Sequence, residues 1–156
     1  MWLPFHQSLL IPFQVFAICQ SLGMPSNERL FTDSPAQPAY DQLLDFVETY
    51  FASFASSDKV DAKVQTTEAA PIYLQQPGHS LTIVGIARHA GQRRNLVVFD
   101  PSFGPSPIMR KLLDGGLKRL ELTSQIDDAM KIYRRLSSGL RKHSCFETLM
   151  LVPILE

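Results

Sequence analysis

The chain has 156 residues and a mass of 17.5 kDa, which is room for about one domain. Its composition, 45% hydrophobic and 19% charged, excludes a disordered or fibrous chain. Fifteen basic side chains balance fifteen acidic ones, which excludes a nucleic-acid module held mainly by positive charge, and two cysteines exclude a disulfide framework. We therefore expect a soluble protein of a reducing compartment, cytoplasm or nucleus.

The amino-terminal segment carries no charged residue from Met1 to Gly23. A secretory signal would place a Lys or Arg before the apolar run, and a membrane span would need more uninterrupted apolar residues, so we expect neither and no membrane partner. Prolines at positions 4 and 12 are expected to interrupt any helix. Residues 24–38, rich in Pro, Ser, Asn and Asp, are typical of a connector. The expected organisation is an atypical leader and connector over 1–38, followed by the main domain over 39–156.

The central part of the chain changes from a helical to a strand period. Apolar residues at i, i+3, i+4 and i+7 spacings predict an amphipathic helix over 40–54, and a polar loop follows it. Short apolar, β-branched runs predict strands over 71–76, 80–87 and 95–100. Because only a short polar turn separates the last two strands, they are expected to form an antiparallel hairpin.

The carboxyl-terminal part predicts two helical segments and a strand. The first helical segment covers 108–113 and is followed by Gly115 and Gly116. The second covers 124–140, with Ser124 as its N-cap and a solvated face that carries several of the 12 Lys and Arg residues found after residue 87. A final strand is expected over 146–153. Strands flanked by helices indicate an α+β domain with a mostly antiparallel sheet.

His79 and Asp100 are the side chains best placed for chemistry. His79 begins one strand of the expected hairpin and Asp100 ends its partner, so antiparallel pairing places both at one end of the sheet. A carboxylate beside an imidazole fixes the tautomer of the ring, as in the orienting half of a nucleophilic triad. The alternative is that His79 is a turn residue and Asp100 caps the loop that follows it. No residues have metal-ligand spacing, and neither a metal nor a cofactor is expected.

No residue stands out as the nucleophile of such a triad. Cys145 is expected to be mostly buried core, and Cys19 lies far from a helix start that would activate a thiol. Ser80 points to the strand face opposite His79, and nothing marks Ser102 as activated. A serine hydrolase is further disfavoured because the chain contains no Gly-x-Ser-x-Gly motif. We expect neither sulfur to approach His79.

Two segments carry a resemblance to a known family: Pro-Ile-Tyr-Leu-Gln-Gln-Pro-Gly-His-Ser-Leu-Thr-Ile-Val-Gly-Ile over 71–86 and Leu-Val-Val-Phe-Asp-Pro-Ser over 96–102. Together they resemble the papain-like cysteine peptidases specific for ubiquitin-fold modifier and ubiquitin, in particular the zinc-finger-containing ubiquitin peptidase branch. The 21-residue interval from His79 to Asp100 fits the interval of that branch. The resemblance covers about residues 40–153 and implies part of a papain-like fold.

The resemblance assigns His79 as general base and Asp100 as its orienting carboxylate. It implies a thiol protease, a hydrolase of the deubiquitinase or ubiquitin-fold modifier protease kind, with ubiquitin or ubiquitin-like conjugates as partners. The chain departs from the family in three places. Ser102 replaces the histidine of the modifier-specific branch, which favours the ubiquitin-directed branch. Residues 75–77 read Gln-Gln-Pro where the family has Gln-His-Gln, and the surroundings of Cys19 do not match those of the family's nucleophilic cysteine.

Two functions follow from these departures. The first is a thiol-dependent isopeptidase domain that is truncated here, lacks its nucleophile and is inactive as an isolated chain. The second is a catalytically inactive fragment or pseudoenzyme that binds ubiquitin.

Overall fold

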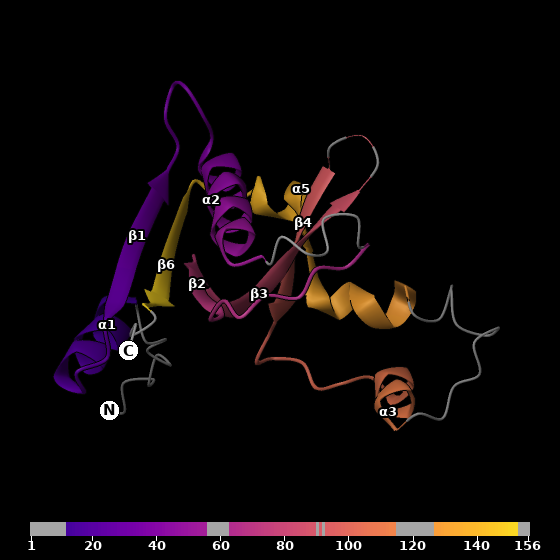
Figure 1. The fold of residues 1–156 in the computed structure, drawn as a ribbon. Coiled ribbons are helices and arrows are strands. Elements are labelled where there is room, and N and C mark those ends of the chain that lie inside the picture. The colour runs from indigo at the N-terminus through magenta and orange to yellow at the C-terminus, as the bar shows by residue number, and fades with distance from the viewer. Residues whose placement is uncertain (1–11, 56–62, 90, 92, 115–126, 153–156) are drawn as a thin grey trace, which may run out of the picture.

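The computed structural model describes residues 12–55, 63–89, 91, 93–114 and 127–152, and these form one sheet with helices against it (Figure 1). Neighbouring strands are antiparallel throughout, in the order β1-β6-β2-β3-β4-β5. The strands are β1 (Ser26–Thr32), β2 (Ile72–Gln76), β3 (His79–His89), β4 (Arg93–Phe99), β5 (Arg134–Leu136) and β6 (Cys145–Leu151). The expected α+β class, with an antiparallel sheet flanked by helices, is confirmed.

The helices within the described residues differ greatly in length. Those with labels are α1 (Pro12–Ser21), α2 (Ala39–Ser53), α3 (Pro107–Leu113) and α5 (Ser137–Leu140), with a 3-10 turn, η2, at Lys131–Tyr133. Residues 127–130 are helical as well. The helix α2 confirms the amphipathic helix expected over 40–54, and α3 confirms the helical segment expected at 108–113. None of the described helices is long and apolar enough to cross a membrane.

The main core lies between α2 and one face of the sheet. Leu43, Leu44 and Val47 of α2 are almost fully buried there. They pack in one cluster with alternate residues of the strands, which include Phe31, Ile72, Leu74, Leu81, Ile83, Leu96, Val98, Phe146 and Met150. Alternation along a strand places every second side chain on the same face, so this cluster defines the α2 face of the sheet.

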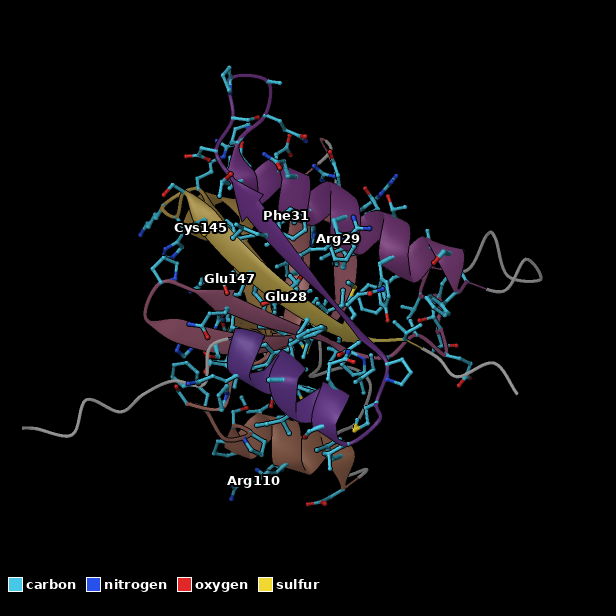
Figure 2. The ribbon with its side chains drawn as sticks, turned by 90° about the vertical axis from the view of Figure 1, so that its left-hand side faces the viewer. Glu28, Arg29, Phe31, Arg110, Cys145 and Glu147 are labelled. Atoms are coloured by element: carbon cyan, nitrogen blue, oxygen red, sulfur yellow. The ribbon has the colours of Figure 1, made fainter. Side chains whose placement is uncertain are left out.

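The opposite face of the sheet is partly covered by α1. Leu149 of β6 alternates with the core residue Met150, and it is buried outside the main cluster. Gln20 of α1 donates to the hydroxyl of Ser26 on β1 at 3.3 Å, which fixes the end of the helix on this face. Figures 1 and 2 show α1 and α2 on different sides of the strands.

The structure corrects two expectations about the amino-terminal part of the chain. The expected connector over 24–38 is wrong for Ser26–Thr32, because β1 pairs along its whole length with β6. Only Ser26 and Phe31 of this strand are buried, so its sequence lacks the alternation that marks a half-buried strand. Pro12 does not interrupt a helix but begins one, since the first helical position needs no amide hydrogen.

The helix expected over 124–140 is also wrong for much of its length. Residues 124–126 lie outside the described residues, and helix is present at 127–130. The chain then passes through η2 into the strand β5, and α5 follows it. Leu136 of β5 is 53% exposed. Pairing of β5 with β4 has overridden the helical spacing of the apolar residues.

Candidate active site

A tight turn delivers His79 to the beginning of β3. Pro77 and Gly78 form the two-residue connection between β2 and β3, and Gln76 pairs directly with His79 across it. Gly78 has a φ of 77°, a left-handed conformation that glycine adopts without steric cost. Proline followed by glycine with positive φ is the combination of a type II turn. The sequence of the turn therefore fixes the position of His79 as the first residue of β3.

Asp100 follows directly on β4 and caps the next turn. Its Oδ1 accepts a hydrogen bond from the main-chain N–H of Ser102 at 2.9 Å, and its carbonyl oxygen accepts one from the N–H of Phe103 at 3.1 Å. The first bond is an Asx turn, in which an aspartate side chain organises the backbone two residues ahead. The capping role considered from the sequence is thus real, and it occupies only one carboxylate oxygen.

The second carboxylate oxygen brings Asp100 and His79 together. His79 Nε2 lies 2.8 Å from Asp100 Oδ2. The side chain of His79 is 31% exposed, whereas that of Asp100 is 1% exposed. The strand register explains the contact, because β3 and β4 are antiparallel and both side chains lie on the α2 face of the sheet. His79 is two residues from the core residue Leu81, and Asp100 is two residues from the core residue Val98, so each shares that face. The expected hairpin and the expected proximity are confirmed, while the catalytic role stays a prediction.

Arg135 is a third member of the site, and it was missed in the sequence. Its Nη2 donates to Asp100 Oδ2, the same oxygen that faces His79. Read as part of a solvated helix face, Arg135 had no reason to meet Asp100; as a residue of β5 it pairs with Leu96 on β4. The local sequence held no signal for this contact, because the spacing of apolar residues around Arg135 favours a helix and pairing with β4 makes the segment extended.

The surroundings of Asp100 keep it ionised. Burial would raise the pKa of this carboxyl group, but the hydrogen bonds from His79 and from the Ser102 N–H, with the charges of His79 and Arg135, outweigh burial and lower the pKa below its ordinary value. An ionised carboxylate can only accept hydrogen bonds, so a neutral His79 must carry its proton on Nε2. The lone pair of Nδ1 is then free to accept a proton, as a general base requires.

Neither cysteine is placed as a partner for that base. Glu147 of β6 pairs with Gln75 and therefore shares a face with it, and Cys145 shares that face in turn, on the side of the sheet opposite His79. Figure 2 shows Cys145 and Glu147 along β6, beside β1. Burial and the charge of Glu147 raise the pKa of the Cys145 thiol, which opposes formation of a thiolate. Cys145 is partly buried at the start of β6.

Cys19 is buried and lies near the carboxyl-terminal end of α1. Its carbonyl oxygen accepts a hydrogen bond from the N–H of Met24 at 2.8 Å, in the turn that ends the helix. Reactive thiolates are favoured at the opposite end of a helix, where the main-chain N–H groups point outward. Neither of the two sulfur atoms is therefore arranged as a nucleophile for His79.

Ser80 and Ser102 both take part in structural hydrogen bonds, Ser80 through its hydroxyl and Ser102 through its main chain. Ser80 lies on the face opposite His79, as expected, and its hydroxyl bonds with Tyr73 at 3.0 Å and with Gln75. Ser102 contributes its main-chain N–H to the Asx turn. Among the described residues, no group of three or more His, Cys, Asp or Glu side chains is positioned to hold a metal ion.

The fold and site together define a class of protein: an antiparallel α+β domain that presents a buried carboxylate and a partly exposed imidazole in contact at one end of its sheet. The model of peptidase family C78 matches residues 12–149. The chain belongs to this family, and the resemblance noted in its sequence to the ubiquitin-peptidase branch is confirmed.

The curated relatives are named as ubiquitin peptidases. The chain is 42% identical over 72 residues to the zinc finger-containing ubiquitin peptidase 1 of Bos taurus, covering 46% of this chain and 12% of that protein. It is 30% identical over 115 residues to the Mus musculus protein of the same name, covering 74% of this chain and 18% of that protein. The Homo sapiens protein is 31% identical over 108 residues, with coverage of 69% and 16%. The chain thus spans less than a fifth of these relatives.

Proposed function

We propose that this domain supplies the general base and the orienting carboxylate of a thiol-dependent peptidase that acts on ubiquitin or ubiquitin-like modifier conjugates. The observation that carries the proposal is the 2.8 Å contact between His79 Nε2 and the buried Asp100, which leaves Nδ1 as the free basic nitrogen. Membership in a peptidase family and relatives named as ubiquitin peptidases support the reaction and the substrate class. A reducing compartment, cytosol or nucleus, is part of the proposal, because a catalytic thiol must stay reduced.

In the proposed reaction, His79 Nδ1 takes the proton of a cysteine thiol as the sulfur attacks the carbonyl carbon of an isopeptide bond. The imidazole then returns the proton to the leaving amine, and water hydrolyses the thioester that remains. Asp100 holds the ring and stabilises its protonated form during both steps. The nucleophile and the donors to the oxyanion would come from a segment other than those holding Cys19 and Cys145, because neither sulfur lies on the face of the site.

A ubiquitin probe with a thiol-reactive carboxyl terminus tests this proposal. The chain alone should remain unlabelled. We also expect labelling of a chimera that keeps the whole chain, with β1 and α1 in place. In this chimera, the segment that precedes the matched region of the mouse relative is fused ahead of the chain, because the family resemblance implies that this segment carries the nucleophilic cysteine. His79→Ala in the chimera should reduce labelling by about four to six orders of magnitude, since the members of a triad act as a unit.

The matched control is His89→Ala, which removes an exposed histidine from the far end of the same strand. It should leave labelling of the chimera unchanged. Equal labelling of the chimera with and without His79 would contradict the proposed base. Labelling of the isolated chain at Cys19 that depends on His79 would contradict the need for a separate nucleophile.

A second candidate is a ubiquitin-binding module without catalysis, and the position of the two cysteines favours it. Binding of unmodified ubiquitin to the chain, measured by NMR titration, distinguishes the two functions when read with the probe experiment. A chimera that binds ubiquitin but is never labelled would favour the binding module. Labelling that requires His79 would exclude it.

A further inference from the structure

The carboxylate of Asp100 is held from three directions. Ser102 donates its main-chain N–H to Oδ1 at 2.9 Å, while His79 and Arg135 both face Oδ2. The Asp100 side chain is 1% exposed, so water contributes little to its solvation. A buried carboxylate needs compensating donors, and a cation among them lowers the cost of burial most. A neutral imidazole supplies a donor without a full charge, so the guanidinium is the permanent cation of this site.

Arg135 is itself held in place by the main chain. Its Nη1 donates to the carbonyl oxygens of Ile132 at 3.2 Å and Arg134 at 3.3 Å, so the flat guanidinium is anchored before it reaches Asp100. The segment is fixed beside β4 by the pairing of β5 and by an edge-to-face contact of Tyr133 with Phe99, with ring centroids 6.1 Å apart. The rigid fork of arginine keeps its geometry once one nitrogen is fixed.

We propose that Arg135 is a positioning residue of the His79–Asp100 pair: it fixes the rotation of the Asp100 carboxylate and thereby the orientation and tautomer of the imidazole. The inference rests on the proposed function for its catalytic meaning. The terminal torsion of an aspartate has a broad energy well, so one donor on each oxygen is needed to hold the carboxylate plane. The main-chain N–H of Ser102 holds Oδ1, and the guanidinium of Arg135 holds Oδ2.

The inference is tested on the isolated chain by NMR, without any need for activity. The variants are Arg135→Met, which removes the guanidinium but keeps the apolar stem, and Arg135→Lys, which restores the charge without the fork. Arg134→Met is the matched control, because it removes the neighbouring guanidinium, which forms an ion pair at 3.2 Å with the 71% exposed Asp127 and not with Asp100. Two signals are followed: the titration of the Asp100 carboxyl carbon and the ring ¹⁵N shifts of His79.

Arg135→Met should raise the pKa of Asp100 towards its ordinary value, because the charge of Arg135 is one of the causes that lower it. The ring ¹⁵N shifts of His79 should move away from those of a fixed Nε2–H tautomer and towards a mixture. Arg135→Lys should recover most of the carboxyl shift and less of the tautomer signal. Among the described residues, His79 and Arg135 are the titratable groups that contact Asp100, so Arg134→Met should leave both signals as in the unaltered chain.

Identical signals in Arg135→Met and Arg134→Met would overturn the inference. If Arg135→Met loses the dispersed amide spectrum of a folded chain, Arg135→Lys decides: the inference fails if this folded variant has a wild-type tautomer signal. These outcomes are separate from the proposed function. Failure of probe labelling in the chimera with normal NMR behaviour would reject the peptidase and leave Arg135 as the group that positions the pair.

Discussion

The molecule contains two clusters of charged side chains with opposite arrangements. At the Asp100 site, one buried carboxylate receives an imidazole and a guanidinium. At the other end of β4, the guanidinium of Arg94 forms ion pairs with three carboxylates that follow one another by about one turn along α2. They belong to Asp41 at 2.6 Å, Glu48 at 3.3 Å and Asp45. We call the second group the Arg94 cluster. It joins the helix α2 to the β3–β4 hairpin, whereas the Asp100 site joins residues of the strands β3 and β5 to the residue that follows β4.

The difference between the clusters lies in burial and in the sign of the central charge. The carboxylates of the Arg94 cluster are 21% to 54% exposed, so each is solvated in part and none depends wholly on the arginine. The Asp100 carboxylate is 1% exposed and depends on its donors alone. Partly exposed ion pairs contribute modestly to stability one at a time, but a cluster holds two elements together. The buried Asp100 carboxylate, by contrast, controls the orientation and tautomer of a single side chain, that of His79.

The largest expected effect comes from removing the centre of the Arg94 cluster. Arg94→Met abolishes three ion pairs at once and leaves their carboxylates to repel one another on one helix face. We expect a loss of about 1–3 kcal/mol in the free energy of unfolding, measured by urea denaturation. Arg88→Met is the control, because Arg88 is 69% exposed and its ion pair within the described part of the chain is with the single carboxylate of Glu48. A smaller loss for Arg94→Met than for Arg88→Met would show that the cluster does not fasten α2.

Asp100→Asn is expected to destabilise the chain less while altering the site more. The amide oxygen can still accept the Ser102 N–H, but the amide nitrogen then faces two donors, His79 Nε2–H and Arg135. An unmatched buried donor costs about 1–2 kcal/mol of unfolding free energy. The imidazole can relieve this by moving its proton to Nδ1, which removes the basic lone pair. Ring ¹⁵N shifts that still report the Nε2–H tautomer in this variant would contradict the role given to Asp100.

Gly78→Ala tests the turn that delivers His79. A φ of 77° is strained for any residue with a Cβ, and no atom lies within 4 Å of the position a Cβ would take, so conformation alone sets the cost. We expect a loss of about 1 kcal/mol in unfolding free energy. Gly104→Ala is the control, since this glycine has open space and no positive φ. Equal stability of the two variants would show that the turn rearranges without cost.

The hairpin and its two functional side chains could be predicted because the information is local. The strand patterns, the short turn between them and the Pro-Gly pair all lie within the hairpin, and antiparallel register then fixes which ends meet. The position of His79 relative to Asp100 follows from these features alone. The Asx turn to Ser102 was considered only as an alternative to the contact with His79. The sequence does not show that Oδ1 can cap the turn while Oδ2 faces the imidazole.

Arg135 and β1 could not be predicted because their structure depends on distant partners. The sequence around Arg135 favours a helix by spacing, and only the neighbouring strand β4 makes it extended. Strand β1 at the sheet edge buries two of its seven residues, so its hydrogen bonds to β6, and not an apolar pattern, hold it in place. Propensity and periodicity report burial well and main-chain pairing poorly.

Acid should weaken both clusters in the same direction, and this effect is expected to be among the smallest. The hydrogen bond from Arg94 lowers the pKa of Asp45 despite partial burial, and the donors around Asp100 lower its pKa although burial alone would raise it. A lowered pKa means that the stabilisation is fully present above the ordinary value of 3.8 and is lost as the pH falls through the folded-state value. Arg94→Met and Asp100→Asn should therefore each lose less stability than the unaltered chain between pH 5 and pH 2, followed by circular dichroism during urea unfolding.

Salt should distinguish the clusters at neutral pH, where the carboxylates of Asp45 and Asp100 are both ionised. Raising NaCl from about 0.1 M to 1 M shortens the screening length from about 10 Å to about 3 Å, and this weakens exposed pairs much more than buried ones. The stability difference between the unaltered chain and Arg94→Met should shrink in 1 M NaCl, because Asp45 is 54% exposed. The difference for Asp100→Asn should persist, because its carboxylate is 1% exposed and its partners approach it directly. A salt effect of equal size in both variants would mean that water reaches Asp100, and burial would then no longer explain why this carboxylate can fix the state of His79.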